Sequence, residues 1–191
     1  MNILSRAVRV AILGSFGVGT VAFADVTVDC NQGSDATAAE CGVNASADGV
    51  DALAVGTESM ATGNSTSAVG GEAVATGPGA TAFGWRSAAG ERSAALGHLA
   101  TATGVRAVAV GENADAQGNN ATAIGNESIA SGVDALAIGD TTAAAGNSTT
   151  AVGGEAISTG PGATAFGWQS AAGERSAALG HLATAAGVRS V

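Results

Sequence analysis

Apolar and polar positions alternate along this chain with a period of fourteen residues, made of two units of seven. In the stretch 119–139 each unit reads small-x-Ala-x-Gly, with glycines at 125, 132 and 139. The residue directly before the glycine is apolar in one unit (Ile124, Ile138) and polar in the next (Ser131). Alternation over about five residues predicts a short strand, and the two residues after each glycine predict a turn. Each fourteen-residue repeat therefore predicts one coil of two strands and two turns.

The repeat continues along almost the whole chain. From Gly42 onward a glycine recurs every seven residues except in two intervals, 84–90 and 167–173, where the spacing is six. The segments 49–106 and 132–189 are near-copies with the same offset that separates these two intervals, 167 - 84 = 83. Self-similarity at a fixed period is typical of a solenoid, so we interpret the copies as an internal duplication of about six coils.

Small residues define one face of each predicted strand. The position two before each glycine is Ala from Ala54 to Ala185, except for Ser158. The position four before is Ala, Ser or Thr, apart from Arg86 and Gln169 in the two six-residue units. Strand alternation puts these two positions on one face. We assign that face to the interior of a narrow roll, where only small side chains fit.

The opposite face of every second strand carries an apolar residue directly before the glycine. We call this row the apolar ladder: Val55, Val69, Phe83, Leu96, Val110, Ile124, Ile138, Val152, Phe166 and Leu179. The intervening strands carry Thr, Ser, Gln or Ala there, including Ala89 and Ala172, which we assign to a polar outer wall. Exposed apolar surface of this extent indicates a partner interface. The simplest partner is another copy of the chain around a symmetry axis.

Charge and composition narrow the class further. After Asp51 every charged residue except Asp115 occupies a predicted turn, so we expect a flattened roll with charged edges. The 191 residues include 30 Gly, no Tyr and only 3% aromatic residues, too few large side chains for a globular core. Glycine every seven residues rather than every three argues against collagen. The formal net charge of -9, or -9 - 2 = -11 without Arg6 and Arg9, argues against binding to a phosphate backbone.

The segment 1–24 is typical of a signal peptide. Arg6 and Arg9 form a basic region, residues 10–21 an apolar run, and Ala22-Phe23-Ala24 a small-x-small cleavage site, which predicts a mature start at Asp25. The apolar run is too short and too rich in glycine to span a bilayer comfortably. We therefore expect an exported protein.

Residues 25–41 do not follow the repeat, and we expect them to cap the first open coil before the repeat domain at 42–191. This segment contains the only two cysteines, Cys30 and Cys41. An exported chain meets an oxidising compartment, so we expect a disulfide between them. Two thiols with no nearby His make a poor zinc site.

Two tryptophans stand out in a chain so poor in aromatic residues. Trp85 and Trp168 follow Phe-Gly at the start of the two six-residue units. One interpretation is an aromatic side chain that fills the kink left by the missing residue. The other is an exposed contact for a host protein.

Other candidate sites have weaker support. His98 and His181 occupy turns in equivalent copies and lack the companion ligands of a metal site. The Glu-Arg pairs at 91–92 and 174–175 are edge charges typical of weak ion pairs between chains or coils. The many Ser and Thr have no base held near them, which argues against a catalytic triad. A period of seven argues against a hexapeptide acyltransferase, and no G-G-x-G-x-D motif indicates a calcium-bound repeat. We predict a protein that is not an enzyme and has no metal or cofactor.

The units at 68–77 (A-V-G-G-E-A-V-A-T-G), 79–85 (G-A-T-A-F-G-W) and 121–132 (A-T-A-I-G-N-E-S-I-A-S-G) resemble the head repeats of YadA-like trimeric autotransporter adhesins. The resemblance covers residues 42–191. It implies an all-β, left-handed parallel β-roll with fourteen-residue coils, assembled as a homotrimer. It also implies display at the outer membrane of a Gram-negative bacterium and attachment to host extracellular-matrix proteins such as collagen, or to cells. The left hand follows from the resemblance alone, since the general rule favours right-handed crossovers.

The printed sequence shows no heptad-repeat stalk, no neck-like segment and no aromatic-girdled strands of a trimeric membrane barrel. We therefore expect no membrane-spanning anchor within this chain, and a location at the cell surface or, without an anchor, a secreted head. Two alternative functions remain open. One is a structural spacer, and the other is an ice-binding solenoid, which would need a more regular array of Thr than the polar wall offers.

Overall fold

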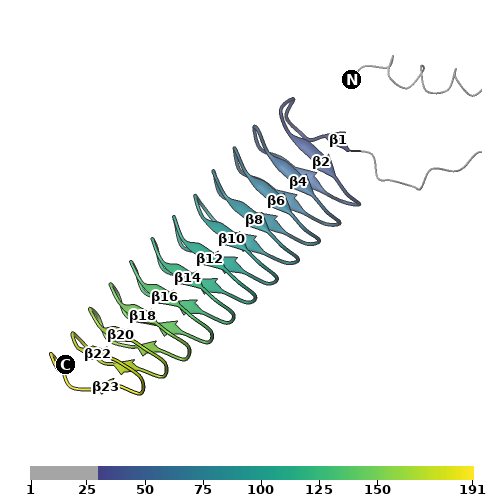
Figure 1. The fold of residues 1–191 in the computed structure, drawn as a ribbon. Coiled ribbons are helices and arrows are strands. Elements are labelled where there is room, and N and C mark those ends of the chain that lie inside the picture. Colours follow the sequence, from purple (N-terminus) through teal and green to yellow (C-terminus); the bar gives the residue numbers. More distant parts are fainter. Residues whose placement is uncertain (1–29) are drawn as a thin grey trace, which may run out of the picture.

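The computed structural model describes residues 30–191, in which every regular element is a β-strand (Figure 1). The predicted signal peptide and the mature start at Asp25 lie outside the described residues. The strands span two or three residues each, shorter than the pattern predicted, and are β1 (Asn31–Gln32), β2 (Ala39–Cys41), β3 (Ser46–Ala47), β4 (Leu53–Val55), β5 (Met60–Ala61), β6 (Ser67–Val69), β7 (Val74–Ala75), β8 (Thr81–Phe83), β9 (Ala88–Ala89), β10 (Ala94–Leu96), β11 (Thr101–Ala102), β12 (Val108–Val110), β13 (Asp115–Ala116), β14 (Thr122–Ile124), β15 (Ile129–Ala130), β16 (Leu136–Ile138), β17 (Ala143–Ala144), β18 (Thr150–Val152), β19 (Ile157–Ser158), β20 (Thr164–Phe166), β21 (Ala171–Ala172), β22 (Ala177–Leu179) and β23 (Thr184–Ala185).

The strands form the two walls of one long roll (Figure 1). The first wall, sheet A, contains β1 and the even-numbered strands, and the second wall, sheet B, contains the odd-numbered strands from β3 to β23. From β2 onward each strand pairs in parallel with the strand one coil further on, so Ile124 aligns with Ile138 in sheet A and Ile129 with Ala143 in sheet B. The predicted parallel β-solenoid with fourteen-residue spacing is therefore confirmed.

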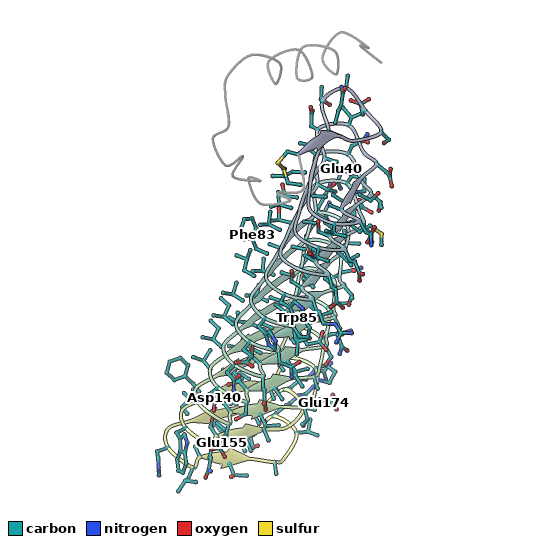
Figure 2. The ribbon with its side chains drawn as sticks, turned by 90° about the vertical axis from the view of Figure 1, so that its right-hand side faces the viewer. Glu40, Phe83, Trp85, Asp140, Glu155 and Glu174 are labelled. Carbon is teal, nitrogen blue, oxygen red and sulfur yellow. A yellow bond between two sulfur atoms is a disulfide. The ribbon has the colours of Figure 1, made fainter. Side chains whose placement is uncertain are left out.

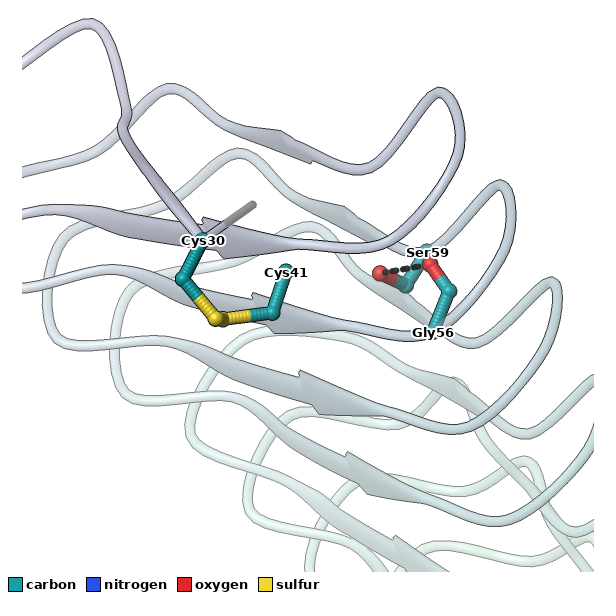
Figure 3. The surroundings of a disulfide bond; sticks show 4 residues. All are labelled: Cys30, Cys41, Gly56 and Ser59. Atoms are coloured by element: carbon teal, nitrogen blue, oxygen red, sulfur yellow. Dashed lines mark hydrogen bonds between the residues drawn. A yellow bond between two sulfur atoms is a disulfide. The ribbon is translucent and has the colours of Figure 1, made fainter. Parts of the chain in front are cut away.

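The core of the roll consists of alanine side chains, as the small-residue face predicts. Ala121 and Ala123 are fully buried, and the equivalent alanines of the other coils are buried as well. Buried hydroxyl groups find a backbone partner within their own turn. Thr66 Oγ1 donates to the Gly63 carbonyl at 2.7 Å, and Ser59 Oγ does the same to Gly56 (Figure 3). Because these hydroxyls are hydrogen-bonded, burying them costs little.

The two six-residue units put different residues in the core from those predicted. Ala89 and Ala172 are 3% and 4% exposed, so they point inward and not toward the polar outer wall. Arg86 and Gln169 lie in turns with positive φ, and not at interior positions. The prediction was wrong because it placed the missing residue within the strand.

The residue that each short unit lacks is the turn glycine after the sheet B strand. The amide of Gly90 donates to the next coil's Ala102 carbonyl, in the same way that Thr76 donates to Ala89 in the coil before. Gly90 therefore occupies the place of Thr76, and Glu91 follows it directly into the turn. The sequence Ala88-Ala89-Gly90 allows the missing residue to lie either within the strand or after Gly90. The hydrogen bonds to the next coil show that it lies after Gly90.

Close contact between coils requires glycine in both sets of turns. After sheet A strands the turn glycines also have a positive φ, as at Gly125 with φ 131°, a backbone conformation that glycine adopts without strain. After sheet B strands the same close contact is found. A Cβ atom at Gly118 would overlap the carbonyl group of Gly132 in the next coil.

The N-terminal segment closes the first coil. Strand β1 pairs antiparallel with β2, and β2 pairs in parallel with β4, with Cys41 aligned to Val55. The parallel repeat therefore begins at Ala39, inside the segment that the sequence assigned to the cap. The sequence does not reveal β2 as part of the repeat, because Glu40 stands at a position that is alanine in the other coils. Its Oε1 accepts a 2.8 Å hydrogen bond from the amide of Ala47.

Backbone and side-chain contacts complete this cap. The amide of Ser34 donates to the Ala47 carbonyl, which covers the first edge of sheet B. Cys30 and Cys41 are joined by a disulfide in the structure (Figure 3). The amide and hydroxyl groups of Thr37 donate hydrogen bonds to Asp35, which lowers the pKa of that carboxyl group below its usual value.

Candidate functional site

The apolar ladder lies on the outer face of sheet A as one row. The register aligns each ladder residue with the next, from Val55 opposite Val69 to Phe166 opposite Leu179. Figure 2 shows Phe83 projecting from this side of the roll, and 49% of its surface is exposed. Ten rungs at a spacing of about 4.8 Å give a strip of roughly 45 Å.

A second row widens this strip, and sequence inspection missed it. Three residues before each glycine, on the same face, lie Leu53, Ser67, Thr81, Ala94, Val108, Thr122, Leu136, Thr150, Thr164 and Ala177. Most of them are half-buried. The signal was the strand alternation itself, because the first and third residues of a three-residue strand share a face. Sheet A therefore presents an outer face without charge along β4 to β22, made of aliphatic and small side chains together with Phe83 and Phe166.

The outer face of sheet B is more mixed than the predicted polar wall. The row directly before the glycines contains Thr and Ser, but Gln117 and Ala145 interrupt it, so no regular array of Thr forms along the described coils. A neighbouring row, also missed, includes the exposed apolar residues Met60, Ile129 and Ile157. Beside Ile157 a hollow of about 190 Å³ opens where Gly173 provides no side chain.

Two charged residues lie on this face, Asp48 beside β3 and Asp115 in β13. Asp48 Oδ2 accepts a 2.9 Å hydrogen bond from the hydroxyl group of Ser46. Asp115 Oδ2 accepts a 2.6 Å hydrogen bond from Gln117, and the buried Oδ1 has no partner within residues 30–191.

The turns form two edges with different charge. We call the turns that follow sheet A strands the A-edge and the turns that follow sheet B strands the B-edge. The A-edge carries Glu58, Glu72, Glu112, Glu127, Asp140, Glu155 and one Arg86, which gives 1 - 6 = -5. The B-edge carries Asp51, Glu91, Asp134, Glu174, Arg92, Arg106, Arg175 and Arg189, which gives 4 - 4 = 0. The basic residues of the described chain are therefore concentrated on the B-edge.

Both tryptophans lie on the A-edge, each stacked on a histidine ring along the roll. Trp85 stacks on His98 of the next coil, with ring centroids 5.0 Å apart and planes 16° apart. Trp168 stacks on His181 in the same way at 4.8 Å. The other side of Trp85 lies against Gly71, where a Cβ atom would approach the indole Cδ1 to 3.1 Å.

This geometry distinguishes the two interpretations of the tryptophans only in part. The missing residue of each short unit lies at the B-edge, so Trp85 does not fill that kink. It fills the space above Gly71 instead. Both tryptophans remain more than two-fifths exposed, at 43% for Trp85 and 44% for Trp168. Their ring faces are covered, and the outer rim of each indole stays open to solvent.

The ion pairs of the edges are exposed and contribute little each. Arg86 Nε lies 3.1 Å from Glu72 in the preceding coil. His98 Nδ1 lies 3.4 Å from Glu112 in the following coil, a contact that is an ion pair only when the imidazole is protonated. Glu91 and Arg92, which the sequence analysis expected to pair between chains or coils, lie 3.6 Å from each other within one turn. The equivalent pair in the second copy, at 174–175, is looser at 3.9 Å.

The described residues show no cluster of metal ligands. Between residues 30 and 191 no three His, Cys, Asp or Glu side chains gather as a metal site. The same part of the chain has no helix suited to crossing a bilayer. The features that remain are an apolar face, a mixed face and two charged edges, all repeated along an elongated roll.

These features define a repetitive β-solenoid that exposes the same faces and edges along its whole length. The YadA head domain repeat model matches residues 42–59, 61–87, 88–114, 102–128, 116–142, 130–156, 144–170 and 171–191. The chain therefore belongs to the YadA head repeat family, as its repeats suggested, and has an adhesin-type role.

A solved structure supports the fold. The chain is similar to the crystal structure of the collagen-binding domain of the Yersinia adhesin YadA, with 23% identity and a TM-score of 0.51. The similarity covers 78% of this chain and 70% of that one. No curated protein sequence matches this chain significantly.

Proposed function

We propose that this chain is the head of a homotrimeric surface adhesin, with the sheet A faces of three chains packed around a threefold axis. The observation that carries the proposal is the apolar ladder, which runs in register along the roll. One chain alone exposes this strip to water. Three chains around an axis cover all three strips, and the alanine core keeps each roll thin enough to approach.

The proposed ligand is an extracellular-matrix protein of the collagen type. The similarity to a collagen-binding domain supports this choice, and the family supports display on a Gram-negative cell surface after export. With the ladder covered, the outer face of sheet B is the broadest surface left for a ligand. Met60, Ile129 and Ile157 supply exposed apolar contacts there among hydroxyl groups. Repetition along the roll gives several weak contacts on one fibre, which increase avidity together.

The test is binding of the purified trimer to immobilised collagen, fibronectin and laminin. Deleting residues 126–153 removes two whole coils and keeps the register, so binding should weaken without being abolished. The double variant Ile129→Asp/Ile157→Asp should weaken binding and leave the trimer intact. A trimer with no affinity for any of the three proteins contradicts the matrix ligand, and a structural spacer then becomes the better explanation.

A further inference from the structure

The two short units share more than a missing residue. Residues 84–99 and 167–182 are identical except at Arg86, which is Gln169 in the second copy. Each segment contains a tryptophan and a histidine on the A-edge and a Glu-Arg pair on the B-edge between them. Among the described coils these two features occur only together.

Within one chain the Trp–His pair and the Glu-Arg pair cannot contact each other, because they lie on opposite edges of the roll. The stack leaves the rim of Trp85 open, and neither indole N–H has a hydrogen-bond partner within the described residues. The Arg92 side chain, 60% exposed, is held only by its neighbour Glu91. Both edges therefore present polar groups that a second surface can engage.

Rotation about the threefold axis of the proposed trimer brings these edges together. Every chain has the same orientation, so the A-edge of one chain faces the B-edge of the next. A pure rotation keeps the height along the roll. The turn that contains Glu91 and Arg92 follows Trp85 and precedes His98 within one coil, so it lies at the level of the Trp85–His98 stack.

We propose that each Trp–His stack is a docking site for the Glu-Arg turn of a neighbouring copy of this chain, an inference that rests on the proposed trimer. The carboxylate of Glu91 accepts the indole N–H of Trp85, and the guanidinium group of Arg92 reaches the acidic A-edge. The second copy repeats the contact with Trp168, His181 and the pair at 174–175.

Charge favours this pairing of edges. The A-edge has a net charge of -5, and four of the five arginines in the described chain lie on the B-edge. Arg106, one turn beyond Arg92 on the B-edge, lies between the levels of His98 and Glu112 of the neighbour. The B-edge is neutral overall, so the attraction is local and acts where an arginine such as Arg106 lies level with an acidic residue of the neighbour's A-edge.

Tryptophan fluorescence tests the proposal, because the chain has only two tryptophans. The variants Trp168→Phe and Trp85→Phe leave one reporter each. In the assembled head the quenching constant for acrylamide should fall by about half relative to a monomeric variant, since an interface excludes water from its centre. The monomeric reference is Ile124→Asp/Ile138→Asp, with folding checked by circular dichroism. Sedimentation equilibrium on the same samples separates the two proposals. A trimer whose tryptophans are quenched as in the monomer overturns the docking site and leaves the trimer standing, whereas a monomeric wild type overturns both.

Cross-linking tests the geometry directly. With Arg92→Cys and His98→Cys in one chain, a short bismaleimide should link neighbouring chains and give a covalent trimer on a denaturing gel. A link within one chain keeps the monomer mass. The matched control places Cys at His98 and at Ser148, a B-edge position several coils away, and should stay monomeric. Equal cross-linking in both variants, or none in the first, contradicts the proposed contact.

Discussion

Charge introduced into the apolar ladder should prevent assembly while each roll still folds. The variant Ile124→Asp/Ile138→Asp changes two adjacent rungs on the outer face of sheet A. In the single chain 37% of Ile124 is exposed, so an aspartate at this position reaches water without disturbing the alanine core. In the proposed trimer the same two substitutions place six carboxylates around the axis.

The magnitude follows from burial. Assembly covers roughly a third of each isoleucine, worth about 1 kcal/mol per side chain, or about 6 kcal/mol for six of them. Burying an unpaired charge costs several kcal/mol per ion, so six carboxylates oppose assembly by a further amount on the order of 10 kcal/mol. A binding constant changes tenfold for roughly every 1.4 kcal/mol, so the trimer should be undetectable. Acidification should restore part of it, because burial raises the pKa of a carboxyl group and the protonated form is neutral.

Sedimentation equilibrium measures the outcome, with far-ultraviolet circular dichroism as the test of folding. The matched control, Ser131→Asp/Ala145→Asp, places two aspartates on adjacent rungs of sheet B, where both side chains are exposed. It should remain trimeric. A wild type that is monomeric, or a ladder variant that remains a trimer, would show that the interface lies on another face.

Two further predictions concern the single chain. Gly118→Ala places a Cβ atom against the backbone of Gly132 and should lower the free energy of unfolding by about 1–3 kcal/mol. The control Gly187→Ala, with only an ordinary contact to Ser190, should change the free energy of unfolding little. Equal melting temperatures for the two variants would contradict the close approach of coils. Reducing the Cys30–Cys41 disulfide, which closes a loop with a sequence separation of 11, should destabilise the cap by about 3 kcal/mol and increase hydrogen exchange in β2 but not in β14. Free thiols in the exported, unreduced protein, or faster exchange along the whole roll, would contradict that expectation.

The sequence predicts the architecture well because every coil repeats the same local rule. Alternation fixes which residues of β14 and β16 face inward, and glycine spacing fixes the turns. The rule fails at the two short units. There Ala89 is as suitable for the core as Ala88, so only the hydrogen bonds to the next coil reveal which one is buried.

Contacts between coils limit the prediction of the site in the same way. Glu40 fits no repeat pattern, yet β2 pairs with β4. The Glu40 side chain stands where other coils have a core alanine, and its carboxylate accepts a hydrogen bond from the Ala47 amide. The Trp85–His98 stack joins residues of adjacent coils, so it could not be predicted from either residue alone. The ladder was visible from the sequence because its residues recur, whereas the second row at Leu53 and Val108 varies in composition.

The offset between the two copies has a consequence for how such a head changes length. The offset equals six coils less the one missing residue, 6 × 14 - 1 = 83. Residues 83 apart therefore occupy the same position within a coil. Strand β8 of one copy and β20 of the other occupy equivalent rungs. Unequal recombination between the two gene segments would therefore add or remove whole turns without shifting any pairing. The length of the head can then vary in steps of about 29 Å, at about 4.8 Å a coil, with no need for a compensating mutation.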